Sequence, residues 1–278
     1  MAEITAQMVK DLRERSGLPM MDCKQALAEV GGDMEKAMEL LRKRGAAAAE
    51  KKAGRATSEG RIGSYLDTQK GVAAIVEMLC ESAPVSNNPM FKELSDKIAR
   101  QAALSGVVDA EALRTSKLVD EPDKTVNDLI HDTVNVIREN MVLGRITRVE
   151  ASKPAVYVHF NGKVGVVLAA EGAGADEATL RDICMHIAFT NPMAVTREQV
   201  PADVVAKEKE ITEEQVKASG KPAAILEKIV AGKMDRWFAE RVLVEQPFVK
   251  DDKKTVGEVL KGIGANVISF ARLQVGVA

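Results

Sequence analysis

Cysteines are few in this chain and long apolar runs are missing, and each of these features excludes a class of protein. The 278 residues include three cysteines, Cys23, Cys80 and Cys184, which lie far apart and form no CxxC pair. A disulfide framework and a cysteine-rich zinc site are therefore unsupported. No apolar run reaches the roughly 18 residues of a membrane helix, and the amino terminus lacks a basic region followed by an apolar signal core. We expect a soluble, cytoplasmic protein without a membrane partner.

The balance of charge argues against a protein whose main role is to hold a phosphate backbone. The formal net charge is -2, from 39 basic and 41 acidic residues. A nucleic-acid-binding domain usually carries a clear basic excess. At 46% hydrophobic and 29% charged residues, the composition suits a globular protein. The length allows one large domain or two to three smaller ones.

Recognisable catalytic and cofactor motifs are also missing. The chain has no GxSxG elbow, no GxxxxGK[ST] loop and no HExxH pair. Gly172 and Gly174 lack the third glycine of a dinucleotide fingerprint, and an ordinary turn explains them better. The three histidines stand apart; His131 carries no signal, and His186 fits a buried helix face. We therefore expect no catalytic residue, no metal, no cofactor and no enzymatic activity.

Apolar spacing predicts a module of three short helices in residues 1–45. Glycine and proline separate the first two helices, Asp22 with Gln25 forms a capping-box pattern, and Asp33 can cap the third helix. So small a module is marginal alone and needs a neighbour or a partner surface. Residues 46–59, with alanines and basic side chains, are expected to form an exposed basic linker or a frayed helix. The apolar positions that set the period are Ile4, Met8, Val9, Leu12, Ala26, Leu27, Val30, Met34, Ala37, Met38 and Leu41.

Two related subdomains are predicted next, each with a strand hairpin followed by helix. Residues 60–145 contain a hairpin pattern with a turn at 69–71, and then helical patterns that we expect to run toward Gly144. Residues 146–197 contain a second hairpin around Asn161-Gly162, the strongest short hairpin signal, and another helix. The shared order suggests an internal duplication.

An antiparallel helical hairpin is predicted for residues 198–241. Its two charged helices are separated by Ser219-Gly220-Lys221-Pro222, where glycine ends one helix and proline begins the next. Residues 242–278 then return to the second subdomain, with a capping box at Thr255 and a final strand. The predicted fold class is therefore α+β, with antiparallel sheets in both core subdomains. The hairpin's apolar faces would pack together and could also seam a homodimer; they carry Val204, Val205, Ile211, Val216, Ile225, Ile229, Met234 and Trp237.

Several stretches resemble one protein family, in the same order along the chain. MAEITA at residues 1–6 and MMDCK at residues 20–24 resemble the amino-terminal signature of elongation factor Ts. Further similar segments are KKAGR at 51–55, VGVVLAA at 164–170 and QPFV at 246–249. The resemblance implies a UBA-like amino-terminal module and a guanine nucleotide exchange factor. Such a factor binds the GDP form of elongation factor Tu and promotes GDP release, with no cofactor and no direct nucleic-acid contact.

The resemblance also implies where the partner binds. The family's magnesium-dislocation loop usually reads Thr-Asp-Phe-Val, but this chain has Ser-Ala-Pro-Val, without the acidic and aromatic side chains. The chain also stops at Val277-Ala278, without the helical extension of longer members. The implied partner-binding residues are Leu12, Met20 and Met21 in the module, Ser82, Ala83, Pro84 and Val85 at the loop, and Tyr157 with His159 in the second subdomain.

Two other functions stay open from the residues alone. The basic linker could belong to a translation-associated nucleic-acid-binding protein, although it contains no aromatic residue for stacking on bases. An enzyme that uses the glycines near Gly172 ranks last, since no nucleophile and base stand at a recognisable spacing. For Met20 and Met21, packing inside the module is the alternative to an exposed contact.

Overall fold

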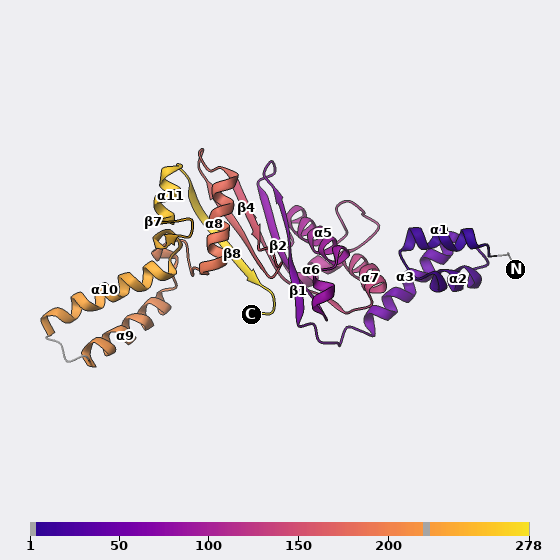
Figure 1. The fold of residues 1–278 in the computed structure, drawn as a ribbon, viewed down its shortest axis with the longest axis horizontal. Helices are drawn as coiled ribbons and strands as arrows, with labels where there is room; N and C mark the ends of the chain where they lie inside the picture. Colours follow the sequence, from indigo (N-terminus) through magenta and orange to yellow (C-terminus); the bar gives the residue numbers. More distant parts are fainter. Residues whose placement is uncertain (1–3, 219–222, 278) are drawn as a thin grey trace. The chain divides into compact units, whose positions relative to one another are not determined.

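The computed structural model describes residues 4–218 and 223–277 (Figure 1). The chain divides into two compact units, one of Met1–Gly63, Val76–Ile146 and Gln274–Ala278, the other of Ser64–Ile75 and Thr147–Leu273. Helices and small sheets with antiparallel pairs make up the fold, so the predicted α+β class is confirmed. The predicted domain boundaries stay a prediction.

The amino-terminal module consists of α1 (Ala6–Ser16), α2 (Met20–Glu29) and the start of α3 (Met34–Glu50). Asp33 caps α3 by accepting hydrogen bonds from two backbone amides, as predicted. The predicted capping box at Asp22 is wrong, because α2 already begins at Met20, directly after Pro19, with no side-chain cap. The module's core is made of Val9, Leu12, Leu18, Cys23, Ala26, Leu27, Ala37 and Leu41.

The third helix is longer than predicted. It continues through the alanine run to Glu50, into the segment expected to be an exposed linker or a frayed helix. Alanine has the highest helix propensity, and Ala49 is buried. Gly45 lets α3 approach α7 (Val126–Ile137) closely, because an added Cβ would lie 2.8 Å from the Asn135 amide nitrogen. Packing against α7 therefore extends the helix.

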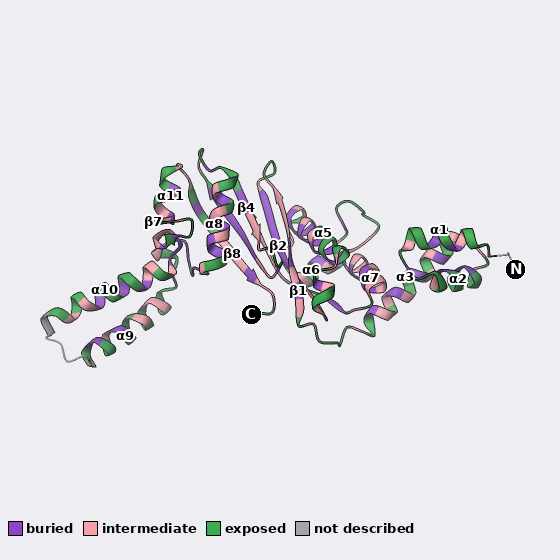
Figure 2. Ribbon diagram, viewed as in Figure 1, coloured by how far each residue is buried: buried purple, intermediate pink, exposed green. Residues whose placement is uncertain are grey.

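The first sheet has the strand order β1 (Glu59–Asp67), β2 (Val72–Cys80), β3 (Met141–Glu150). The strand β2 is buried along almost all of its length (Figure 2). The helix predicted to run toward Gly144 ends instead at Ile137, because Arg138 adopts a left-handed conformation with φ of 73°. Gly144 lies in β3, which the sequence did not predict. Between β2 and α7 lie α4 (Ala83–Ser86), α5 (Pro89–Ser105) and α6 (Ala110–Thr115).

The second sheet has the order β4 (Lys153–Val158), β5 (Val164–Glu171), β8 (Asn266–Gln274). β4 and β5 pair antiparallel around the turn at Asn161-Gly162, where Gly162 has φ of 71°, as the sequence predicts. The helix α8 (Glu177–Thr190) packs across β4 and β5 (Figure 1).

The remaining elements include the two-helix hairpin and the capped helix α11. In the hairpin, Val216, Met234 and Trp237 are buried as predicted, but Ile211 and Ile225 are exposed and lie outside the seam. The predicted turn at residues 219–222 lies outside the described residues. Within residues 4–218 and 223–277, no helix is both long and apolar enough to cross a membrane. The capping box predicted at Thr255 is confirmed at the start of α11. The remaining elements are α9 (Ala202–Ala218), α10 (Ala223–Arg241), η1 (Arg197–Gln199), η2 (Leu243–Glu245), β6 (Pro247–Phe248), β7 (Asp251–Thr255) and α11 (Val256–Gly262).

Candidate partner-binding surfaces

Two methionines form an exposed apolar surface at the start of α2. Met20 and Met21 are 52% and 70% exposed, respectively. They lie in the first turn of the helix, since α2 begins directly after Pro19. The module's core is filled by other residues, so neither methionine is one of its buried members. A flexible, polarisable methionine pair of this kind can adapt to an apolar partner.

Leu12 lies in the core of the module and not on its surface. Its side chain is 0% exposed and packs in the core of the module, together with Val9 on the same face of α1. Residues three apart on a helix share a face, and here that face points inward. In this conformation Leu12 therefore supports the module from within, and its expected contact with a partner stays a prediction.

The segment at residues 82–85 forms a short helical turn. Ser82 precedes α4, and its backbone amide and hydroxyl both donate to the Glu139 carboxylate, at 3.0 and 2.6 Å. Proline in the first turn fixes its own backbone angle. Ala83 and Pro84 are exposed, whereas Val85 is half-buried. The turn thus presents a small, stiff apolar surface in place of a carboxylate and an aromatic ring.

Tyr157 and His159 are brought together at the end of β4. The Tyr157 hydroxyl and the His159 Nδ1 are 2.9 Å apart, and both residues are half-buried. Arg181 of α8 lies over the Tyr157 ring at 5.5 Å. The neighbouring Phe160 is 91% exposed, and its ring centroid lies 4.5 Å from that of His159. Phe160 was not predicted as a contact residue, although an aromatic residue directly before a predicted Asn-Gly turn could have indicated it.

The basic segment after the module is partly neutralised within the chain. Arg55 pairs with Glu81 at 3.4 Å, and at the end of the module just before this segment Lys43 pairs with Glu39 at 2.7 Å and Arg44 with Glu29 at 2.6 Å. These basic groups already have acidic partners, which weakens the case for a strip that binds phosphates.

The glycine stretch near Gly172 has a packing explanation. A Cβ added at Gly172 would lie 2.2 Å from the Gly264 carbonyl oxygen, and one added at Gly174 would lie 1.9 Å from that of Ile263. Both glycines are needed for the close approach of two backbone segments. They therefore give no support to a ligand-binding loop.

The buried titratable groups of the second unit are structural. Burial lowers the pKa of His186, which keeps the imidazole neutral. The Val249 amide donates to His186 Nδ1 at 3.3 Å, so Nε2 carries the proton that reaches Gln246 Oε1 at 2.9 Å. Burial raises the pKa of the Cys184 thiol to about 12, which leaves it unreactive. In the part of the chain that the structure describes, no three His, Cys, Asp or Glu side chains are grouped to hold a metal ion.

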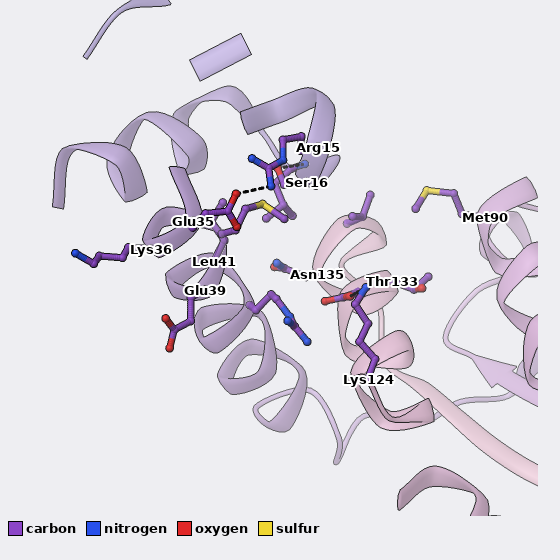
Figure 3. A pocket seen from close by; sticks show the side chains of 15 residues that line it. Arg15, Ser16, Glu35, Lys36, Glu39, Leu41, Met90, Lys124, Thr133 and Asn135 are labelled. Atoms are coloured by element: carbon purple, nitrogen blue, oxygen red, sulfur yellow. Dashed lines mark hydrogen bonds and ion pairs between the residues drawn. The ribbon is translucent and has the colours of Figure 1, made fainter. Parts of the chain in front are cut away.

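A cavity of about 610 Å³ lies between the module and α7, beside the contact that Val136 of α7 makes with the module's core (Figure 3). Arg15 and Glu35 form an ion pair on its module side, and Asn135 and Lys124 line the opposite side. Burial raises the pKa of Asp132, and the nearby Lys124 at 3.6 Å only partly opposes this. Charges of both signs line this cavity, so it offers no single recognition chemistry and is best described as the seam between two packed parts of the first unit.

Sequence comparison relates the chain to one group of proteins. A family profile described as Elongation factor TS matches residues 81–277. The elongation factor Ts of Idiomarina loihiensis is 45% identical over 274 residues, which cover 98% of this chain and 91% of the relative. That of Hydrogenovibrio crunogenus is 42% identical over 273 residues, covering 98% and 92%. That of Clostridium botulinum strain 657 is 40% identical over 284 residues, again covering 98% and 92%.

Proposed function

Because the chain belongs to the elongation factor Ts family, we propose that it is the guanine nucleotide exchange factor of elongation factor Tu. It binds the GDP form of this partner and promotes GDP release during translation elongation. The structural observation that most supports the proposal is the exposed Met20–Met21 pair, which lies outside the completed core of the module. An apolar pair held on a folded module suits a protein partner better than a small molecule or a phosphate backbone.

Exchange of this kind requires binding energy, and no group on the factor has to react. If the exchange protein binds its partner more tightly when the nucleotide is absent, it must weaken the partner's affinity for the nucleotide in the same ratio, because the two binding equilibria are linked. We assign Met20 and Met21 to the GTPase domain of the partner, and the turn at residues 82–85 to the region of its magnesium ion. Tyr157 and His159, in the second unit, would form a separate contact, to which the exposed Phe160 adds apolar area.

The test is stopped-flow release of a fluorescent GDP from the cognate elongation factor Tu. Micromolar amounts of the protein should accelerate release, and the rate should saturate as its concentration rises. No GTP or GDP should be hydrolysed by the protein alone. Unchanged release at saturating protein would refute the proposal. A steep fall in binding with salt, measured with RNA in a parallel titration, would instead favour the nucleic-acid-binding alternative.

The two-helix hairpin is proposed to join a second copy of this chain. Ile211 and Ile225 are exposed on α9 and α10, outside the packed seam between these helices. Analytical ultracentrifugation should detect a dimer that Ile211→Glu with Ile225→Glu abolishes. A monomer at all concentrations would remove this part of the proposal.

A further inference from the structure

Two of the proposed contact surfaces are tied to consecutive residues of one short segment. Directly after α7, Arg138 extends its guanidinium to Asp22, with 2.6 Å between the nearest nitrogen and oxygen. Asp22 stands next to Met21 in α2. The following residue, Glu139, accepts both hydrogen bonds from Ser82, which begins the turn at residues 82–85.

The third residue of this segment fixes the connection between them. Asn140 is buried, and its side-chain amide donates to the carbonyl oxygens of Ala53 and Arg55, at 3.3 and 2.9 Å. These carbonyls lie between α3, which carries the module, and β1. The Asn140 backbone amide donates to the Glu81 carboxylate at 2.6 Å, one residue before Ser82. Residues 138–140, here named the clasp, therefore hold the module, its connection and the turn.

The backbone of the clasp has an unusual conformation. Arg138 has φ of 73°, in the left-handed region, and its amide donates to the Val134 carbonyl at 2.8 Å to close α7. Glycine is the usual residue at such a helix end, because a side chain makes this conformation unfavourable. An arginine at this position makes the helix end less stable than a glycine would, but its side chain can form the ion pair with Asp22 of α2.

We propose that Arg138, Glu139 and Asn140 are positioning residues, which hold the Met20–Met21 surface and the turn at residues 82–85 at a fixed separation so that one partner meets both at once. This inference rests on the proposed exchange function. Two weak contacts on one rigid body act together, because forming the first places the second at high effective concentration. If the two surfaces moved independently, conformational entropy would be lost separately at each contact, and binding would be weaker.

The variants can separate positioning from folding. Arg138→Gly removes the ion pair but suits the left-handed backbone, so the fold should not be weakened. Ser82→Ala removes one hydrogen bond to Glu139 and leaves the backbone amide bond in place. The matched control is Glu29→Gln, which breaks an ion pair of the same 2.6 Å length and similar exposure inside the module.

The first measurement needs no partner. Spin labels on Lys24→Cys in α2 and Asn87→Cys after α4 report the separation of the two surfaces by double electron–electron resonance. Both positions are exposed, whereas the native cysteines are buried. The distance distribution should be narrow in the parent and in the Glu29→Gln control, and broad when Arg138→Gly and Ser82→Ala are combined. The charge reversal Asp22→Arg with Arg138→Asp, made together with Ser82→Ala, should give a narrow distribution because it restores the ion pair with its charges exchanged.

The second measurement is the concentration dependence of GDP release. The combined variant should need about 10-fold more protein for half-maximal acceleration, because the effective concentration of the second contact falls. Arg138→Gly alone, which lies outside both contact surfaces, should change the maximal rate less than about twofold. The charge reversal should recover most of that loss. A narrow distribution in the combined variant, or equal broadening in the control, would overturn the inference. If the parent fails to accelerate GDP release, the proposed function fails, while the distance measurement still decides whether the clasp fixes the two surfaces.

Discussion

Replacing Met20 and Met21 with alanine tests whether the exposed pair is a contact surface. The two residues are 52% and 70% exposed, so roughly half to two thirds of the surface of each is available for burial by a partner. Full burial of a methionine side chain is worth about 1.5–3 kcal/mol. Scaling by the available fraction gives about 2–3.5 kcal/mol for the pair, or about a 30- to 300-fold loss of affinity.

The assay compares binding with stability in two variants. The methionine double mutant should bind elongation factor Tu weakly in titration calorimetry and keep the thermal midpoint of the parent. Leu12→Ala should lower the thermal midpoint, because truncating a fully buried leucine typically lowers the free energy of unfolding by about 2–5 kcal/mol. If the methionine mutant loses as much thermal stability as Leu12→Ala, or binds like the parent, the contact assignment is wrong.

Three further predictions concern the turn, a buried histidine and a packed glycine. Ala83→Asp with Pro84→Phe should speed GDP release by about 10- to 100-fold at magnesium concentrations that slow the parent, since a buried aromatic ring is worth about 1.5–3 kcal/mol; an unchanged magnesium titration would contradict this. Because burial lowers the pKa of His186 below 6.5, the unfolded chain takes up a proton first as pH falls through that value. The free energy of unfolding should therefore decrease from about pH 6.5 downward, and denaturant titrations of His186→Gln should lack this component. Gly174→Ala should lower the free energy of unfolding by about 1–3 kcal/mol or more, because its Cβ would lie 1.9 Å from a carbonyl oxygen. The control is Gly262→Ala, whose Cβ would have no neighbour within 4 Å, and it should leave the thermal midpoint unchanged or raise it.

Local signals in the sequence predicted the elements that local physics determines. The helical period found the module, the Asn161-Gly162 pair found the hairpin of β4 and β5, and the capping box at Thr255 found the start of α11. The prediction failed where a residue without a breaking signal ended an element. Arg138 is an ordinary helix former by propensity, so nothing in the sequence marked the end of α7 or the start of β3.

Partner contacts were harder to predict than elements, because exposure depends on how the module packs. Leu12 and Met20 are both apolar residues of the same small module, and only packing decides that one is buried and the other half exposed. The ties between surfaces are also remote in sequence. Asp22 and Arg138 are 116 positions apart, and Ser82 and Glu139 are 57 apart. No periodicity or capping pattern encodes contacts at such separations.

The clasp also bears on the altered turn at residues 82–85. A proline at position 84 cannot supply the area of a phenylalanine ring, so the turn loses direct contact energy. The turn is, however, held before any partner arrives, by two hydrogen bonds from Ser82 to Glu139 and by the proline's fixed backbone angle. A segment that is ordered in advance loses less conformational entropy on docking, which offsets part of the missing area. Ser82→Ala should therefore reduce the acceleration of GDP release more in this chain than in the Ala83→Asp, Pro84→Phe background, where the aromatic ring supplies its own contact. Equal reductions in both backgrounds would show that ordering of the turn and the contact area of the ring do not substitute for each other.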